Sequence, residues 1–111
     1  MDAPLLINVI PELAEELKTL LVKAELPGVA EQLDALRIVD RCRCGEDACA
    51  SFYTANRPDG AWGAGHENVS LNTESGFLIL DLVHKKIVHI EVLDKAEIKQ
   101  KLDKILPLHK E

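Results

Sequence analysis

Apolar residues recur with helical spacing near the start of the chain. After Pro11 they return every three or four positions, which places them on one face of an α-helix. These residues are Leu13, Leu17, Leu20, Leu21 and Ala24. Proline is tolerated in the first turn of a helix, and a Pro-Gly pair interrupts one. We therefore expect a helix that begins at Pro11 and is stopped by Pro27 and Gly28.

The pattern then changes from helical to β-forming. Residues 29–33 have apolar spacing for one or two further helical turns. Residues 36–39 are rich in branched apolar side chains, which favour strands. We expect a short second helix and then a strand that begins near Leu36.

The clearest β pattern covers residues 77–93, where two apolar runs flank residues 84–86. This arrangement is typical of a β-hairpin. The predicted pairs are Val83 with Ile87, Asp81 with His89, and Ile79 with Glu91. This register gathers six aliphatic side chains on the other face, namely Leu78, Leu80, Leu82, Val88, Ile90 and Val92. A shift by one residue would mix the two faces, so we predict this register and the burial of the aliphatic face.

The end of the chain has the pattern of another helix. Asp94 and Glu97 have the spacing of a capping box. Apolar residues follow at helical spacing until Pro107, at Ile98, Leu102, Ile105 and Leu106. Helices towards both ends with strands between them indicate an α+β fold. We expect one globular domain over residues 1–111, with an N-terminal helix, a short second helix, a mainly antiparallel sheet of four or five strands, and a C-terminal helix.

The predicted hairpin also resembles a known pattern. Residues 76–81 read GFLILD and residues 87–94 read IVHIEVLD. This is similar to the C-terminal pattern of a family of small bacterial domains of unknown function, in which a glycine-led strand ending in Asp pairs with a strand that reads Ile-Glu-Ile/Val-Leu. The resemblance covers about a fifth of the chain and implies no activity.

The net charge disfavours some classes of partner. Thirteen Lys and Arg residues against nineteen Asp and Glu residues give −6 at pH 7. This charge repels phosphate groups, so we expect neither nucleic acid nor an anionic membrane as a partner, whereas a basic protein is permitted. Residues 1–55 hold ten of the acids and only five of the bases. Their glutamates either solvate helix faces or form a partner-binding surface: Glu12, Glu15, Glu16, Glu25 and Glu31.

The chain contains no stretch that suggests membrane insertion. Its longest apolar run, residues 5–10, is far shorter than the ~20 residues of a spanning helix. The N-terminal residues lack the basic start of a secretory signal. We expect a cytoplasmic protein, and the sequence does not indicate its oligomeric state.

Three cysteines lie within eight residues, at Cys42, Cys44 and Cys49. Their thiolates could bind zinc, with His66 as the nearest fourth ligand and Asp47 or water as a substitute. Four protein ligands would close the tetrahedron and make the site structural rather than catalytic. The spacing of the cysteines is not that of a zinc knuckle, however, so other roles remain open.

The same segment also fits two strands of a hairpin. If residues 36–44 pair with residues 49–55, Cys44 faces Cys49 and the thiols are inert, because free cysteines are commonly buried as small apolar side chains. A third interpretation is thiol redox chemistry, which Arg41 and Arg43 would favour by stabilising a thiolate.

The loop between residues 56 and 68 is long for a connection between strands. Long loops often carry function. This loop contains Trp62, the only tryptophan, together with Arg57 and His66. Trp62 either covers the core or anchors an interface, where tryptophan is enriched. We take Trp62, Arg57 and His66 as the candidate binding residues.

The sequence does not predict a catalytic site. Asp81 and His89 could resemble part of a catalytic relay, but the spacing brings none of Ser51, Ser70 and Ser75 to His89. We therefore expect a small acidic protein that binds another protein, such as an immunity or antitoxin-like inhibitor, without being an enzyme. A protein with a structural zinc site, or a thiol redox protein, is the alternative.

Overall fold

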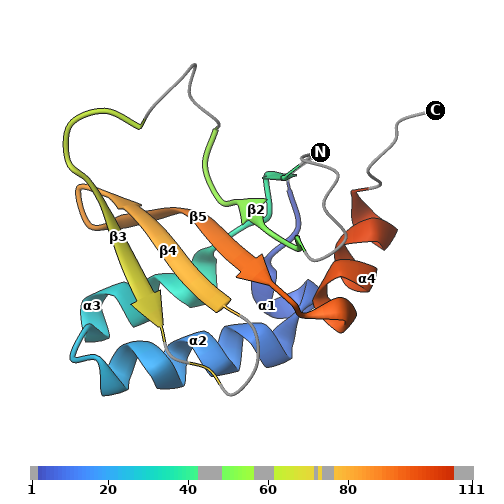
Figure 1. The fold of residues 1–111 in the computed structure, drawn as a ribbon, viewed down its shortest axis with the longest axis horizontal. Coiled ribbons are helices and arrows are strands. Elements are labelled where there is room, and N and C mark those ends of the chain that lie inside the picture. Colours follow the sequence, from blue (N-terminus) through green and yellow to red (C-terminus); the bar gives the residue numbers. More distant parts are fainter. Residues whose placement is uncertain (1–2, 43–48, 57–61, 72, 74–76, 107–111) are drawn as a thin grey trace.

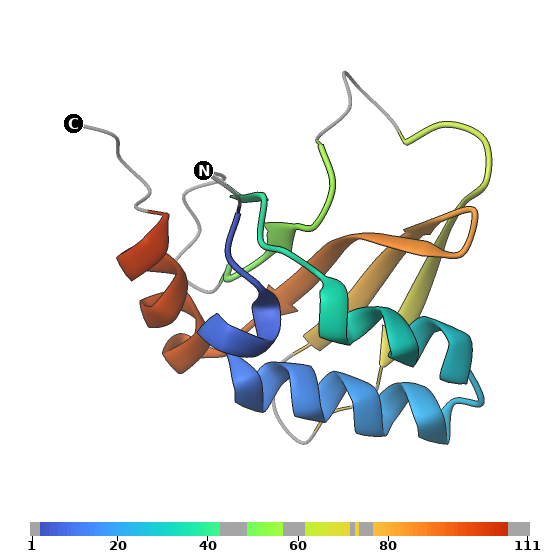
Figure 2. The ribbon, with the colours of Figure 1, turned by 180° about the vertical axis from the view of Figure 1, so that it is seen from behind.

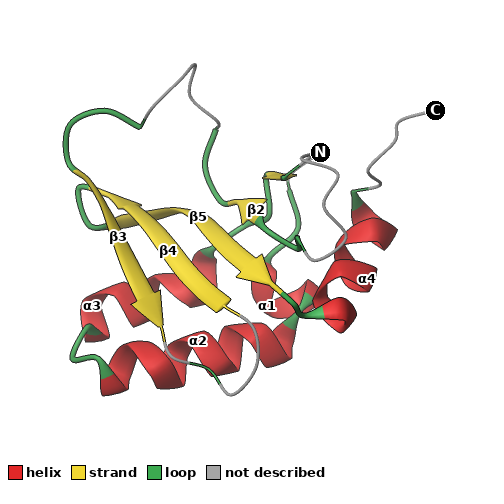
Figure 3. Cartoon of the chain, in the orientation of Figure 1, coloured by secondary structure: helices red, strands yellow, loops and turns green. Residues whose placement is uncertain are grey.

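The protein folds into one antiparallel sheet with helices against it (Figures 1 and 3). The structure is a computed structural model that describes residues 3–42, 49–56, 62–71, 73 and 77–106. In these residues the elements are α1 (Leu6–Val9), α2 (Pro11–Lys23), α3 (Pro27–Ala30), the 3-10 helix η1 (Glu31–Ala35), β1 (Asp40–Arg41), β2 (Phe52–Tyr53), β3 (His66–Leu71), β4 (Phe77–Val83), β5 (Lys86–Leu93) and α4 (Ala96–Ile105). The strand order is β1-β2-β5-β4-β3, and every neighbouring pair is antiparallel. The predicted α+β class is confirmed.

The N-terminal helices form a layer on one face of the sheet. Helix α2 begins at Pro11, as predicted, and its apolar face joins the core through Leu13, Ala14, Leu17 and Leu21. Helices α1, α2 and α3 lie on the same side, and no helix of the described residues covers the opposite face (Figures 1 and 2). None of the described helices is long and apolar enough to cross a membrane.

Strands β4 and β5 form the predicted hairpin, with one correction to its register. His84 and Lys85 both have positive φ, of 50° and 68°, and form a two-residue turn of the kind that suits twisted strands. This tight turn pairs Val83 with Lys86, not with Ile87. A bulge on β5 follows and restores the predicted pairs Asp81–His89 and Ile79–Glu91. The predicted aliphatic face is buried, and the bulge adds Ile87 to it.

Strands β1 and β2 form a short antiparallel pair, which was predicted with longer strands. Asp40 pairs with Tyr53 and Arg41 pairs with Phe52. Strand β2 joins this pair to the rest of the sheet, because Phe52 pairs with Ile90 and Tyr53 with His89 of β5. The predicted contact between Cys44 and Cys49 lies outside the described residues, since these include Cys49 but not Cys44.

Helix α4 is fixed to the rest of the fold by a buried cation. Its predicted capping box does not form, because Lys95 occupies the N-cap position without a side-chain hydrogen bond and Asp94 has a φ of 61°. The guanidinium of Arg41 instead contacts the carboxylate of Asp103 and donates to the backbone carbonyl of Leu106 at 3.0 Å. The side chain of Arg41 is only 1% exposed, so these contacts compensate its charge inside the fold.

Candidate functional site

The open face of the sheet carries a row of polar side chains that crosses all five strands. The register places Asp40, Tyr53, His89, Asp81 and Asn68 opposite one another, in that order from β1 to β3. Side chains of a strand alternate between its two faces. The neighbouring row, which includes Phe52, Ile90 and Leu80, is therefore buried under the helices, and the polar row points away from them.

Asp81 is the centre of this row. Its Oδ1 accepts hydrogen bonds from Nε2–H of His66, at 2.8 Å, and from the amide of Asn68, at 2.5 Å. Its Oδ2 accepts a hydrogen bond from Nδ1–H of His89 at 2.8 Å. Asp81 and His89 are each 14% exposed and His66 is 30% exposed. The carboxylate is thus largely shielded from solvent and held by groups from both neighbouring strands.

These hydrogen bonds assign the tautomers of the two histidines. An ionised carboxylate only accepts, so the ring nitrogen that contacts it must carry the proton. In the neutral rings, Nδ1 of His66 and Nε2 of His89 are then lone-pair acceptors. The structure records no hydrogen bond from another described residue to either of these two nitrogens.

Aromatic rings surround the histidines. The ring of Tyr53 is next to that of His89, with centroids 4.5 Å apart and the ring planes tilted by 46°. Trp62 joins the group from the loop before β3, with its centroid 6.2 Å from Tyr53 and 6.5 Å from His66. We call Tyr53, Trp62, His66, Asp81 and His89 the open-face cluster. The cluster combines neighbouring aromatic rings with a carboxylate that is largely shielded from solvent.

Two glycines shape the approach of the loop to β3. Gly63 and Gly65 have φ values of 85° and 84°, which favour glycine over other residues. Gly65 also packs against His84, because a Cβ built on it would lie 2.6 Å from the His84 ring. The amide of His84 donates to the carbonyl of Gly65 at 3.1 Å. These contacts fix the chain between Trp62 and His66.

The structure brings together some of the predicted site residues and separates others. Of the three predicted binding residues, Trp62 and His66 are in the same cluster, whereas Arg57 lies outside the described residues. Cys42 is half-buried and Cys49 is buried. Cys44 lies outside the described residues.

His66 is far from the predicted zinc ligand Cys49. His66 pairs with Val83, which pairs with Lys86 at the start of β5, whereas Cys49 forms a bridge with Leu93 at the end of β5. At ~3.3 Å per residue, these two ends of β5 are roughly 20 Å apart. His66 is also bound to Asp81. The structure therefore does not place His66 beside Cys49, and among the described residues no group of three or more possible ligands has the geometry of a metal site.

Two glutamates of the acidic first half, Glu12 and Glu16, lie in the helical layer and not on the open face. Glu12 and Glu16 belong to α2 and contact Lys101 and Lys95 near α4. The hydrogen bond from Lys101 lowers the pKa of Glu12 below its usual value. These glutamates hold α4 against α2, so they are not on the same surface as Trp62.

Sequence reasoning found the Asp81–His89 pair but missed Tyr53 and Asn68 as members of the site. Residues 56–68 were predicted to be a loop, whereas β3 begins at His66 and places both His66 and Asn68 on the open face. Tyr53 is brought to His89 only by the pairing of β2 with β5. The local sequence around Tyr53 contains no signal for that pairing.

The cluster lacks a nucleophile within the described residues. Ser51 is buried, and its hydroxyl accepts a hydrogen bond from the amide of Val92 at 2.9 Å. Ser70 faces Ile79, further along β3 than Asn68. Thr54 donates its hydroxyl to the carbonyl of Ile87 at 2.9 Å. Asp81 thus orients the imidazole of His89, but none of these three hydroxyls contacts that ring.

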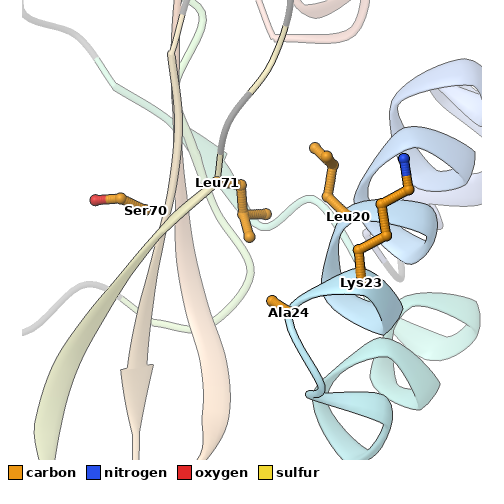
Figure 4. Close-up of a pocket in the computed structure, with 5 residues that line it drawn as sticks. All are labelled: Leu20, Lys23, Ala24, Ser70 and Leu71. Carbon is orange, nitrogen blue, oxygen red and sulfur yellow. The ribbon is translucent and has the colours of Figure 1, made fainter.

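A separate hollow of ≈ 330 Å³ lies between α2 and β3 (Figure 4). It is lined by Leu20, Lys23, Ala24, Ser70 and Leu71. The Ser70 hydroxyl points away from the helix, whereas Leu71 points towards it (Figure 4). The described lining residues offer aliphatic side chains and one amine but no aromatic ring, so the open-face cluster is the richer candidate for recognition.

Comparison with protein-family models, curated proteins and solved structures finds no match to this chain. The resemblance of the hairpin to the small bacterial domains stays a prediction.

Proposed function

We propose that the protein binds another protein through the open face of its sheet, with Trp62 at the centre of the contact. The observation that carries this proposal is the packing of Trp62 and Tyr53 around two histidines that Asp81 holds in place. Tryptophan and tyrosine are enriched among residues that dominate binding energy. A surface whose side chains are already ordered also loses less conformational entropy on binding.

The charge of this face supports a basic protein as the partner. Its outward strand residues include the acids Asp40, Asp81 and Glu91 against the cation Lys86. The whole chain has a net charge of −6, which would accelerate association with a cationic protein and repel nucleic acid. A cytoplasmic inhibitor of a basic enzyme, similar in kind to immunity proteins and antitoxins, fits these properties, as does a bacterial origin.

The experiment is affinity capture from the native cells with three forms of the protein. Trp62→Ala removes the central ring, and Val22→Ala truncates an apolar side chain that is 60% exposed on α2, in the helical layer. We expect a basic protein to be recovered by the wild type and by Val22→Ala and to be lost with Trp62→Ala. The partner is then purified and its binding measured directly with the same variants. Equal recovery by all three forms would contradict the proposal.

The alternative function uses the cysteines. Cys42 follows β1 and Cys49 precedes β2, so both lie at the same end of this antiparallel pair, and the amide of Cys42 donates to the carbonyl of Ser51 at 2.8 Å, which continues the pairing. A structural zinc site there would use Cys44 as well, whereas a redox pair needs only two of the three thiols. Either would act at the end of the sheet that lies away from Trp62. The two functions can be tested separately.

A further inference from the structure

We infer that the open-face cluster binds the guanidinium group of an arginine side chain. This inference rests on the proposed function, because the arginine would belong to the basic partner. The cluster offers three properties on one small surface: fixed acceptors, aromatic rings and negative charge. Guanidinium is the protein group that uses all three.

The acceptors come from the hydrogen bonds of Asp81. Asp81 accepts one hydrogen bond from a ring N–H of His66 and one from a ring N–H of His89. The other nitrogen of each neutral ring therefore has a lone pair that can accept a hydrogen bond. The imidazoles cannot turn to offer N–H groups without breaking a hydrogen bond to the carboxylate. A ligand that only donates hydrogen bonds therefore suits this surface, and a guanidinium carries five N–H donors and no acceptor.

The rings supply a second contact. Trp62 lies with its centroid within 6.5 Å of both Tyr53 and His66, and Tyr53 is next to His89. Cations are attracted to the faces of aromatic rings, most strongly to tryptophan, and arginine makes such contacts more often than lysine. A planar guanidinium can stack on Trp62 while its edge donates to the imidazole nitrogens.

Charge and shape separate arginine from other ligands. The carboxylate of Asp81 is only 14% exposed, so its charge is weakly screened and would repel a phosphate or a carboxylate. Lysine has the correct charge, but its ammonium is compact and strongly hydrated and cannot stack. Arginine is planar and less strongly hydrated, and its donors are spread widely enough to reach separate acceptors.

Trp62 gives a direct measurement because it is the only tryptophan in the chain. The probes are three five-residue peptides of glycine that differ only at the central position, which is arginine, lysine or citrulline. Citrulline keeps the length and planarity of arginine and removes its charge. Each peptide is titrated into the full-length protein while the fluorescence of Trp62 is followed, at low and at moderate salt.

We expect a saturable change with the arginine peptide in the millimolar range, at least about five-fold tighter than with the lysine or the citrulline peptide. Asp81→Asn should weaken arginine binding by a similar factor, because one imidazole loses its fixed orientation. Tyr53→Leu should weaken it as well. Glu91→Gln, which removes a charge from the same face but outside the cluster, is the matched control and should have a smaller effect.

The outcomes distinguish this inference from the proposed function. Equal binding of the arginine and lysine peptides, or equal effects of Asp81→Asn and Glu91→Gln, would overturn the inference. If a basic partner is captured through Trp62 but the arginine peptide does not bind, the docking surface stands and the guanidinium site fails. If the peptide binds but no partner depends on Trp62, the site recognises guanidinium and the proposed function fails.

Discussion

Asp81 on β4 and His89 on β5 lie directly opposite each other, and Nδ1–H of His89 donates to Oδ2 of Asp81 at 2.8 Å. The other oxygen of the same carboxylate holds His66 and Asn68 from β3. One acidic side chain therefore orients groups from the strands on both sides of β4. Changes at Asp81 should affect the whole open face.

Asp81→Asn should change the tautomer of one histidine. An amide has one acceptor oxygen and one donor nitrogen, so it cannot accept from both His66 and His89 through separate atoms as the carboxylate does. Long-range proton–nitrogen NMR should show the wild type with His66 protonated at Nε2 and His89 at Nδ1. In the variant we expect one ring to switch and the free energy of unfolding to fall by about 1 kcal/mol. Unchanged tautomers in both rings would contradict the assigned network, and Glu91→Gln is the control.

Gly65→Ala should destabilise the protein more than Gly63→Ala. Both residues have φ near 85°, so both substitutions carry the cost of a left-handed backbone, about 1 kcal/mol. Only Gly65 has a neighbour within reach, the His84 ring at 2.6 Å from the added Cβ. We expect an additional loss below about 1 kcal/mol for Gly65→Ala, measured by urea unfolding, because the exposed His84 ring has room to turn away from the added Cβ. His84→Ala in the same chain should recover the additional part, and equal losses for the two glycines would exclude a clash.

The contact between Arg41 and Asp103 should make stability sensitive to acid. The hydrogen bond from Arg41 lowers the pKa of Asp103 below its usual value. A lowered folded-state pKa means that this contribution is complete above the unfolded pKa, about 4, and is lost as the pH falls through the lower folded value.

Asp103→Asn is the matching variant. Its cost at neutral pH should be about 1 to 2 kcal/mol, discounted because the Asp103 side chain is 43% exposed although Arg41 is buried. Urea unfolding at pH 7 and near pH 3 should show a smaller acid loss in Asp103→Asn than in the wild type. The control is Glu97→Gln, on the exposed first turn of α4. This variant retains the contact between Arg41 and Asp103, so the stability that this contact loses in acid should be the same as in the wild type. A variant with the wild-type acid sensitivity would show that the ion pair contributes little.

The thiols of Cys42 and Cys49 should differ in reactivity. If the cysteines bind zinc, His66 should not be one of the ligands. Cys49 is buried and Cys42 is half-buried, so iodoacetamide should label Cys42 first in the native protein. Elemental analysis of protein purified without a histidine tag tests the zinc prediction. Zinc below about a tenth of an equivalent would argue against a site.

Two variants then identify the ligands. If zinc is bound by the cysteines, Cys49→Ser should lose it and His66→Gln should retain it, because His66 lies at the other end of β5. Retention by Cys49→Ser would remove that cysteine from the site. Rapid labelling of Cys49 in the folded protein would instead favour the redox interpretation.

Local patterns in the sequence predicted the elements whose structure depends on local spacing. The helix from Pro11 and the buried aliphatic face of β4 and β5 follow from periods of 3.6 and 2 residues, which any chain with this spacing shares. The Asp81–His89 pair was predicted for the same reason, because a hairpin joins residues that are close in sequence. The turn was less predictable, since His84 and Lys85 adopt positive φ without being glycine.

The open-face cluster was decided by the tertiary structure. Tyr53 is next to His89 because β2 pairs with β5, and His66 reaches Asp81 because β3 pairs with β4. The sequence indicated His66 as a zinc ligand only because it was the nearest histidine along the chain. Hydrophobic spacing determines which face of a strand is buried, but strand order depends on the free energy of the whole packed sheet. The chain alone therefore specified the two sides of the sheet, and only the fold determined which polar residues meet on the open one.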